Sequence, residues 1–285
     1  MGKGMLNNLI AKMPSGTEFL VWNRSKDVVN GIAGEHANVT VAATAKEVVE
    51  KCETTYCMLS TLEASVAVFD SLDGVIAGVS VGKTIVDCAT LTPERIKDAA
   101  ARIAAAGGLF LEAPVSGSKV PAEKGALIFL CGGDRAVFDA IRPALDMMGK
   151  ASFLFGDVGQ GSRLKLIVNM IMGTMLSAFG EGMALCEAAD LPADKLLEVL
   201  NLGAMANPMF QLKGPNMIKD THPTHFPLKH AQKDIRFAIC MADELGVSLP
   251  TSAAANESFK RARVEHGDED FSAVYSVLKK PKSKK

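Results

Sequence analysis

The 285-residue chain lacks the features that mark several classes of protein. Its formal net charge is −1, so the overall balance favours neither nucleic acid nor an anionic membrane surface as a partner. Only one apolar run reaches about 18 residues, and it is interrupted by Lys165 and Asn169. We therefore expect no nucleic-acid partner and no insertion into a membrane.

Cysteine and histidine are present without the spacing of metal ligands. The six cysteines are scattered through apolar segments, which is typical of buried, reduced thiols, so we predict a cytoplasmic location. His222, His225 and His230 fall close together. Pro223 and Pro227 interrupt that segment, and no carboxylate or cysteine stands at ligand spacing beside the histidines. No metal site is predicted.

The glycine-rich fingerprint of dinucleotide-binding domains, G-x-G-x-x-G after a first strand, is also missing. Gly2-Lys3-Gly4 is a G-x-G, but no strand precedes it, and Asn7 occupies the position of the third glycine. Judged by this motif alone, dinucleotide binding is only weakly indicated.

Short apolar runs alternate with helical patterns through the first 158 residues. Runs without a polar alternation are typical of strands buried on both faces, so we predict a parallel sheet covered by helices on both sides. The predicted strands are residues 19–22, 39–41, 55–59, 84–88, 109–113, 126–131 and 152–155, and the predicted helices are 5–13, 45–52, 62–71, 93–106 and 135–147.

The remainder of the chain shows helical patterns only. They cover residues 162–189, 193–201, 230–245 and 250–265. We therefore predict an α/β domain of residues 1–158 and an all-helical domain of residues 159–285 that a long helix opens. The lysine-rich residues 279–285 are interpreted as a solvated tail.

The start of the long helix carries an unusual pattern. Gly159 and Gly161 allow the backbone to turn, and Ser162 is the predicted N-cap. The helix is apolar almost all round, but Lys165 and Asn169 share one face, about 6 Å apart along the axis. This face is either a narrow solvated stripe or a proton donor beside a hydrogen-bonding amide on a rigid element.

Polar residues follow several predicted strands. In a dinucleotide fold the second strand ends beside the adenosine ribose, where an arginine suits a 2′-phosphate, so Asn23-Arg24 favours NADP over NAD. The alternative is a solvated strand end. Residues 58–60 and 87–90 end two more strands at the same edge. Ser116-Gly117-Ser118 is either an ordinary turn or an anion-binding concavity.

Four stretches together resemble the β-hydroxyacid dehydrogenase family: FLEAPVSGS (110–118), GQGSRLKLIVNMIMG (159–173), NLGAMANPMF (201–210) and FPLKHAQKD (226–234). Within the family the chain is most similar to the glyoxylate/succinic semialdehyde reductases, including the dehydrogenase domain of the nuclear cytokine-like oxidoreductases. The similarity covers almost the whole chain. It implies a doubly wound, Rossmann-type N-terminal domain, an interdomain helix and an all-α C-terminal domain.

The resemblance also implies an activity. It is the NADPH-dependent reduction of small aldehyde acids, glyoxylate to glycolate or succinic semialdehyde to 4-hydroxybutyrate, with Lys165 as the general acid. The implied substrate-binding residues are Ser116, Gly117, Ser118, Asn169 and Phe226. The implied cofactor-binding residues are Gly2, Asn23, Arg24, Met58, Leu59, Ser60, Thr90, Lys233 and Asp234.

The chain departs from the family pattern at its start. Gly2 corresponds to the third glycine of the fingerprint, so we expect the N-terminal domain to lack its first strand and two phosphate-contacting glycines. In addition, Ala89 stands where the family usually has serine.

Two rival functions stay open. An NAD-dependent dehydrogenase of the 3-hydroxyisobutyrate type is disfavoured by Arg24. A scaffold without turnover is favoured by the missing glycines and disfavoured by Lys165 and Asn169. A homo-oligomer is expected, because a long apolar helix in an all-helical domain commonly packs against a partner subunit.

Overall fold

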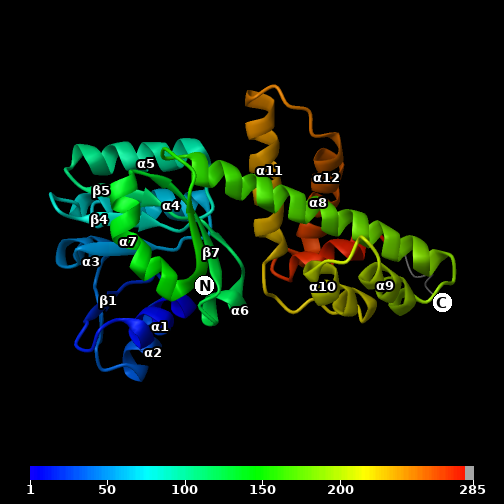
Figure 1. Ribbon diagram of the computed structural model, residues 1–285, viewed down its shortest axis with the longest axis horizontal. Coiled ribbons are helices and arrows are strands. Elements are labelled where there is room, and N and C mark those ends of the chain that lie inside the picture. Colours follow the sequence, from blue (N-terminus) through cyan, green and yellow to red (C-terminus); the bar gives the residue numbers. More distant parts are fainter. Residues whose placement is uncertain (280–285) are drawn as a thin grey trace. The chain divides into compact units, whose positions relative to one another are not determined.

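The computed structural model describes residues 1–279 and divides into two compact units. The first unit is Met1–Lys165 and the second begins at Leu166, so the division falls within α8 (Gln160–Ala188) (Figure 1). Six residues of the predicted solvated tail, 280–285, lie outside the described part of the chain.

The strands of the first unit form two sheets. In the smaller sheet, β1 (Phe19–Val21) pairs in parallel with β2 (Val39–Val41). The larger sheet has the order β3-β4-β5-β7-β6, and β8 pairs with β7 along Leu127–Cys131. Its strands are β3 (Thr54–Cys57), β4 (Thr84–Asp87), β5 (Leu109–Glu112), β6 (Val115–Ser116), β7 (Leu127–Gly133) and β8 (Gly149–Leu154).

The larger sheet is mixed, so the prediction of a parallel sheet is wrong in part. β3, β4 and β5 are parallel, but β7 runs antiparallel to β5 and to β6, while β8 is parallel to β7. Strands buried on both faces have the same apolar composition in either direction, so composition could not reveal the reversal.

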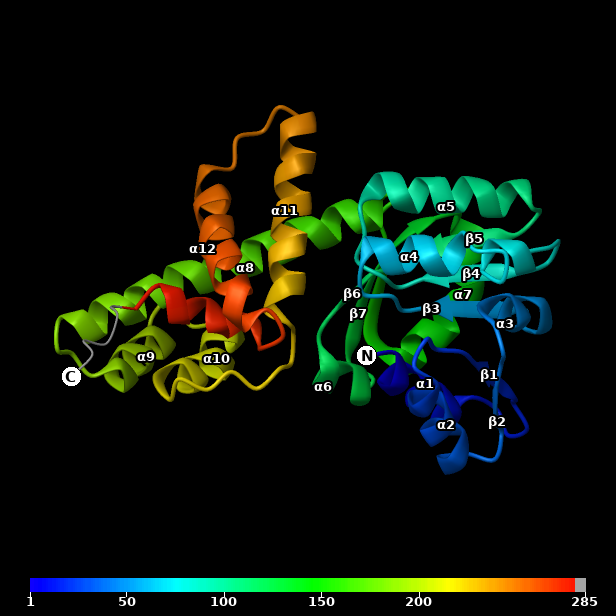
Figure 2. The same ribbon diagram turned by 180° about the vertical axis from the view of Figure 1, so that it is seen from behind.

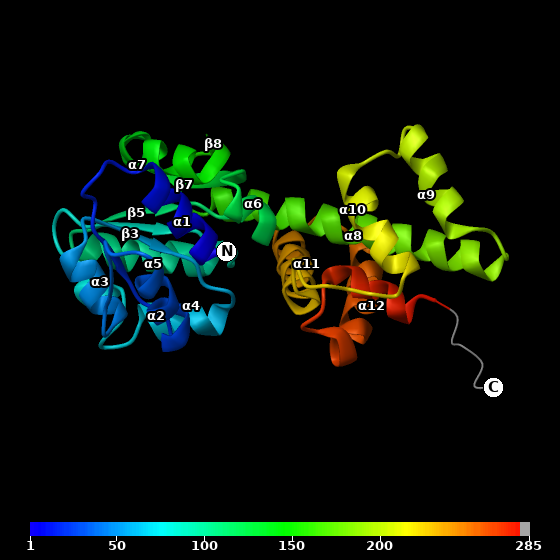
Figure 3. The ribbon, with the colours of Figure 1, turned by 90° about the horizontal axis from the view of Figure 1, so that it is seen from below.

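Helices cover both faces of this sheet, as a doubly wound fold requires (Figures 1 and 3). Neighbouring strand residues point to opposite faces: Ile85 and Phe110 pack in one core, while Val86 and Leu111 pack in the other. The first core is completed by α3 (Ala45–Lys51), α4 (Leu62–Phe69) and α5 (Pro93–Ala105), and the second by α1 (Gly2–Lys12), α6 (Lys119–Glu123) and α7 (Arg135–Met148). The predicted Rossmann-type architecture is confirmed.

Among the described residues, no strand pairs with both the β1–β2 sheet and β3, so the two sheets are not joined by a ladder. Within these residues, β1 pairs with β2 alone and β3 pairs with β4 alone. This agrees with the expected lack of a first strand. β1 and β3 therefore each keep one edge that no strand of the described chain pairs with.

The second unit is helical, as predicted. After α8 come α9 (Ala193–Leu202), α10 (Pro208–Ile218), α11 (Leu228–Glu244), α12 (Pro250–His266) and the 3-10 helix η2 (Phe271–Val277). α11 and α12 lie side by side (Figure 2). The unit has its own core, in which the rings of Phe179 and Phe210 stack with centroids 4.4 Å apart. A Cβ at Gly173 would lie 2.6 Å from Ile235 Cδ1, so this glycine allows α8 and α11 to approach closely.

Several short elements were not predicted. They are α2 (Lys26–Glu35), α6, β6, α10 and the 3-10 helices η1 (Ile76–Gly78) and η2. α2 contains two glycines and an asparagine, and α10 contains Gly214 and Pro215, all of which have low helix propensity. Tertiary packing overrides propensity at both helices.

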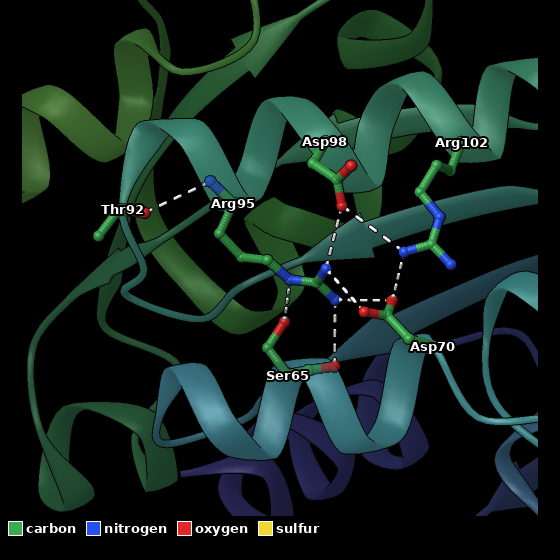
Figure 4. Close-up of polar contacts among 6 residues, drawn as sticks. All are labelled: Ser65, Asp70, Thr92, Arg95, Asp98 and Arg102. Atoms are coloured by element: carbon green, nitrogen blue, oxygen red, sulfur yellow. Dashed lines mark hydrogen bonds and ion pairs between the residues drawn. The ribbon is translucent and has the colours of Figure 1, made fainter.

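A buried arginine ties α4 to α5 (Figure 4). The Arg95 guanidinium, 8% exposed, donates hydrogen bonds to the Ser65 hydroxyl and carbonyl at 3.1 and 3.2 Å. It also pairs in a bidentate manner with Asp70 at 3.1 Å. Asp98 and Arg102 complete the cluster. Because every bond is charge-assisted and little solvent reaches the guanidinium, this cluster should contribute more than an exposed ion pair.

We expect Arg95→Ala to lower the free energy of unfolding by about 2–4 kcal/mol, because it leaves the buried acceptors of Ser65 without their donor and breaks the bidentate pair with Asp70. Urea denaturation would measure the change. Arg135→Ala is the matched control: it removes an exposed Arg–Asp pair on α7 and should change stability by less than about 1 kcal/mol. Equal losses in the two variants would contradict the role given to the Arg95 cluster.

Candidate active site

The carboxyl ends of β3, β4 and β5 lie at one edge of the sheet, because these strands are parallel neighbours. Met58, Leu59 and Ser60 follow β3, and Thr90 follows β4 by three residues. α1 begins beside them, since a Cβ added at Gly2 would lie 3.7 Å from Met58 Cβ. The structure thus brings Gly2 and the residues after β3 together at the edge where α/β sheets bind ligands.

Asn23 and Arg24 follow β1, which belongs to the other sheet. The Asn23 side-chain amide donates to the Ser25 carbonyl at 3.2 Å, and Arg24 is exposed. Trp22 precedes them and is the only tryptophan of the chain. It lines a pocket of about 250 Å³ whose other walls are Ala43, Thr44, Ala45, Ala67, Val68, Ser71 and Asp73.

The Ser-Gly-Ser turn joins β6 to α6. Ser116 ends β6 and is held opposite Ile128 of β7. Gly117 has φ of +128°, and a Cβ there would lie 2.9 Å from Leu127 Cδ2, so only glycine fits. Ser118 is the N-cap residue of α6, and its hydroxyl makes no capping bond to that helix.

Glu112, the last residue of β5, anchors the start of α8. Its fully buried carboxylate accepts hydrogen bonds from the backbone N–H of Gly159 (2.5 Å), Gly161 (2.9 Å) and Ser162 (3.1 Å), and from the Ser162 hydroxyl at 2.6 Å. Burial raises the pKa of Glu112 above its ordinary value, although these four donors act in the opposite direction.

The prediction that Ser162 is the N-cap of this helix is wrong. α8 begins at Gln160, so Ser162 lies in its first turn, and its hydroxyl donates to Glu112. The cap is supplied by a strand far away in sequence, and the local pattern of glycines and serine could not reveal this.

The polar face of α8 is buried. Lys165 is 5% exposed and Asn169 is 4% exposed, and the same face continues through buried Gly173 and Ser177. The interpretation as a solvated stripe is therefore wrong. In contrast, the apolar side chains of Ile167, Ile171 and Met175 are exposed on α8. A helix with its polar residues inside must satisfy them with specific partners.

In the second unit, Asn169 is locked to α11. Its side-chain amide donates to Asp234 Oδ2 at 2.6 Å, and Lys233 Nζ lies 2.7 Å from Asp234 Oδ1 as an ion pair. Lys233 Nζ also lies 4.9 Å from the centre of the Phe237 ring. Asp234 therefore fixes the orientation of the Asn169 amide and the position of the Lys233 amine.

Phe226 is held by a second buried acid. Asp270 accepts from the Phe226 N–H at 3.1 Å and pairs with buried Lys213 at 2.8 Å. Burial tends to raise the pKa of Asp270, but the hydrogen bond and charge of Lys213 outweigh it and leave the pKa below its ordinary value. The Phe226 ring meets Phe271 edge-on, with centroids 5.6 Å apart.

Two buried acids, Glu112 and Asp87, have roles that the sequence did not predict, although residue 87 was counted among the polar residues at a strand end. Each ends an apolar strand, and the two lie opposite each other in the pairing of β4 with β5. Asp87 Oδ1 accepts from the Ala89 N–H at 3.0 Å, and burial raises the pKa of Asp87 to about 6. An acidic residue that closes a buried apolar strand was the available signal.

Metal-ligating side chains do not gather anywhere in residues 1–279: no three histidine, cysteine or acidic residues there could hold one ion. The described cysteines are free, and Cys240 is exposed although buried thiols were expected.

Family models match both parts of the chain. The NAD-binding domain of 6-phosphogluconate dehydrogenase matches residues 1–156, and the NAD-binding domain of NADP-dependent 3-hydroxyisobutyrate dehydrogenase matches residues 159–278. The chain belongs to the β-hydroxyacid dehydrogenase family. It is therefore an oxidoreductase that uses a nicotinamide dinucleotide and acts on a small molecule.

Similar curated proteins of this family carry a more specific name. The chain is 46% identical to glyoxylate/succinic semialdehyde reductase 1 of Arabidopsis thaliana, covering 98% of this chain and 95% of that protein. It is 44% identical to the chloroplastic reductase 2 of the same plant, covering 100% and 78%. The cytokine-like nuclear factor N-PAC of Xenopus tropicalis is 36% identical over 96% of this chain, which spans 51% of that protein.

Solved structures of β-hydroxyacid dehydrogenases share the fold. The 3-hydroxyisobutyrate dehydrogenase of Mycobacterium tuberculosis, solved with L-serine, has a TM-score of 0.86 at 25% identity and covers 98% of this chain and 96% of that one. The Salmonella typhimurium enzyme has the same TM-score at 24% identity, with 97% and 95% covered.

The buried acid Asp87 should make stability depend on pH. Since the pKa of Asp87 is raised from 3.8 to about 6, the folded state holds this proton more tightly than the unfolded chain. Its contribution therefore lowers the free energy of unfolding as the pH rises from about 4 to about 6, by about 3 kcal/mol in total. Asp87→Asn should remove this fall, as urea denaturation across that range would show.

Asp139→Asn is the control for this experiment. It neutralises an exposed carboxylate on α7 and should keep the wild-type pH dependence. If Asp87→Asn loses stability with rising pH as steeply as the wild type does, Asp87 does not titrate in this range.

Proposed function

We propose that this chain is an NADPH-dependent reductase of small aldehyde acids, converting glyoxylate to glycolate and succinic semialdehyde to 4-hydroxybutyrate. The observation that carries the proposal is the buried pair Lys165 and Asn169 on α8, together with the names of the relatives that are 46% and 44% identical. In this proposal residues 1–158 form the NADP-binding domain and residues 159–285 the helical domain.

Proton delivery is the task of Lys165 in this mechanism. When bound, NADPH supplies a hydride to the aldehyde carbon. The Lys165 ammonium donates a proton to the carbonyl oxygen, so the aldehyde becomes a primary alcohol and NADP⁺ is the oxidised product. Asn169, oriented by Asp234, positions the substrate. Ser116, Gly117 and Ser118 bind its carboxylate, and Phe226 contacts its carbon chain.

Binding of the cofactor is assigned to a second set of residues. Arg24 and Asn23 bind the 2′-phosphate, and the pocket beside Trp22 suits an adenine ring in volume and in its largely apolar walls. The other proposed cofactor residues are Gly2, Met58, Leu59, Ser60, Thr90, Lys233 and Asp234. The two phosphate-contacting glycines of the family have no counterpart among the described residues, so the chain's own affinity for NADPH is a decisive measurement.

A homo-oligomer in the cytoplasm is part of the proposal. Several large apolar side chains of the second unit are exposed, as at the surfaces through which subunits associate: Ile171, Leu185, Val199, Leu202 and Leu212. α8 is long and apolar enough to cross a membrane by length and composition alone, a test that core helices also pass. We propose that it does not cross one, because its buried Lys165 and Asn169 have protein partners.

Lys165→Ala should lower kcat for glyoxylate by about 10²–10⁴-fold, because the proton donor is lost. The rate of NADPH oxidation measures kcat, and circular dichroism checks that the variant is folded. Lys195→Ala, which removes an exposed lysine of α9, should keep the wild-type rate. A folded Lys165→Ala enzyme with normal turnover would show that another group donates the proton.

Arg24→Ala should weaken the binding of NADPH by about 10–100-fold and that of NADH by less than about threefold, since a charge-assisted contact to the 2′-phosphate is lost. Quenching of the single tryptophan, Trp22, reports both affinities. Lys26→Ala is the control for a nearby exposed charge. A wild-type chain that prefers NADH would favour a dehydrogenase of the 3-hydroxyisobutyrate type, and one that binds neither cofactor would favour a scaffold.

A further inference from the structure

Glu112 does more in this fold than cap a helix. We infer that Glu112 is a positioning residue for the reaction of Lys165, an inference that rests on the function proposed above. Its carboxylate makes four hydrogen bonds to the segment that begins α8, two on each oxygen. No other side chain of the described chain is seen to bond these three backbone N–H groups.

The geometry of the helix transmits this anchoring to Lys165. Lys165 follows Ser162 by three residues, which is less than one turn and about 4.5 Å along the axis. Bonds to consecutive N–H groups of a first turn fix the helix along its axis and about it. A first turn that shifted by one residue would rotate the lysine by about 100°.

The first turn of α8 packs closely against β7 and the Glu112 carboxylate. A Cβ at Gly161 would lie 2.1 Å from the Leu130 carbonyl oxygen, and a Cβ at Gly132 would lie 2.1 Å from Glu112 Oε1. Glycine at both positions allows the loop, the strand β7 and the carboxylate to meet. The contact therefore combines the hydrogen bonds of the carboxylate with close packing, which the absence of side chains at the two glycines allows.

The same residue also leads into the proposed carboxylate-binding turn. Only buried Ala113, Pro114 and Val115 separate Glu112 from Ser116. Glu112 thus precedes the turn by four residues in the chain, and its side chain holds the start of the lysine helix. The proposed carboxylate-binding turn and Lys165, which would act on the same substrate, both lie in the first unit: the turn is near Glu112 in the chain, and the helix of Lys165 is in contact with it.

A purely structural cap offers the matched comparison. Asp134 caps α7 by accepting from the N–H groups of Ala136 and Val137 at 2.7 and 3.1 Å. α7 carries none of the proposed site residues. Loss of either cap should reduce stability, but only loss of the Glu112 cap should reduce turnover.

The experiment compares Glu112→Ala with Asp134→Ala. We expect Glu112→Ala to lower kcat about 10–100-fold while KM for NADPH changes by less than about threefold, and Asp134→Ala to keep kcat within about twofold. Acetate has the heavy atoms of the removed side-chain portion, so adding it should restore kcat of Glu112→Ala at least about fivefold. It should not restore Lys165→Ala.

The outcomes distinguish the positioning role of Glu112 from the proposed function. If Lys165→Ala is inactive and folded Glu112→Ala turns over at the wild-type rate, the positioning role is wrong and the proposed function stands. If Lys165→Ala is active, the proposed function fails independently. Should Glu112→Ala not fold, Glu112→Gln decides, because it places a donor against the Ser162 N–H: a fall in kcat of about 3–10-fold supports the role, and wild-type kcat overturns it.

Discussion

The rest of this structure depends on the contact between one carboxylate, Glu112 at the end of β5, and the first turn of the long helix α8. Glu112 is fully buried, and burial of a carboxylate is unfavourable unless donors replace the lost water. Three backbone N–H groups and one hydroxyl do so, at the positive end of the helix dipole. Four charge-assisted hydrogen bonds thereby join the sheet to the helix that carries Lys165.

Beyond that contact, α8 reverses the usual arrangement of a surface helix. Lys165, Asn169 and Ser177 are buried, while Ile171 and Met175 are exposed. Burial of the polar face is compatible with a stable fold because specific partners satisfy it, as Asp234 does for Asn169. Family models of nicotinamide-dependent dehydrogenases match both parts of the chain, and a buried polar face suits such chemistry better than it suits packing alone.

Much of the fold followed from local patterns, and the errors have physical causes. Apolar runs and N-caps located β3, β4, α4 and α5 to within one or two residues. They could not give the direction of β7, since a strand buried on both faces looks the same either way, nor α2, whose glycines hide a helix that packing creates. At the candidate site, Lys165 and Asn169 were predicted as a pair, but Glu112 and Asp270 act on segments about 50 residues away in sequence, and no spacing rule connects them.

The small β1–β2 sheet has a consequence for how the first unit responds to ligands. In the described chain this ribbon has no hydrogen-bonded ladder to the larger sheet, so local opening of the ribbon breaks none of the strand pairs of that sheet. Arg24 and Trp22 lie directly after β1. A ligand bound by these residues would bind the closed ribbon and not the opened one. The rate of amide hydrogen exchange in Phe19–Val21 would therefore fall as the fraction of bound protein rises. The affinity for each cofactor and the population of the closed ribbon would then depend on the same equilibrium.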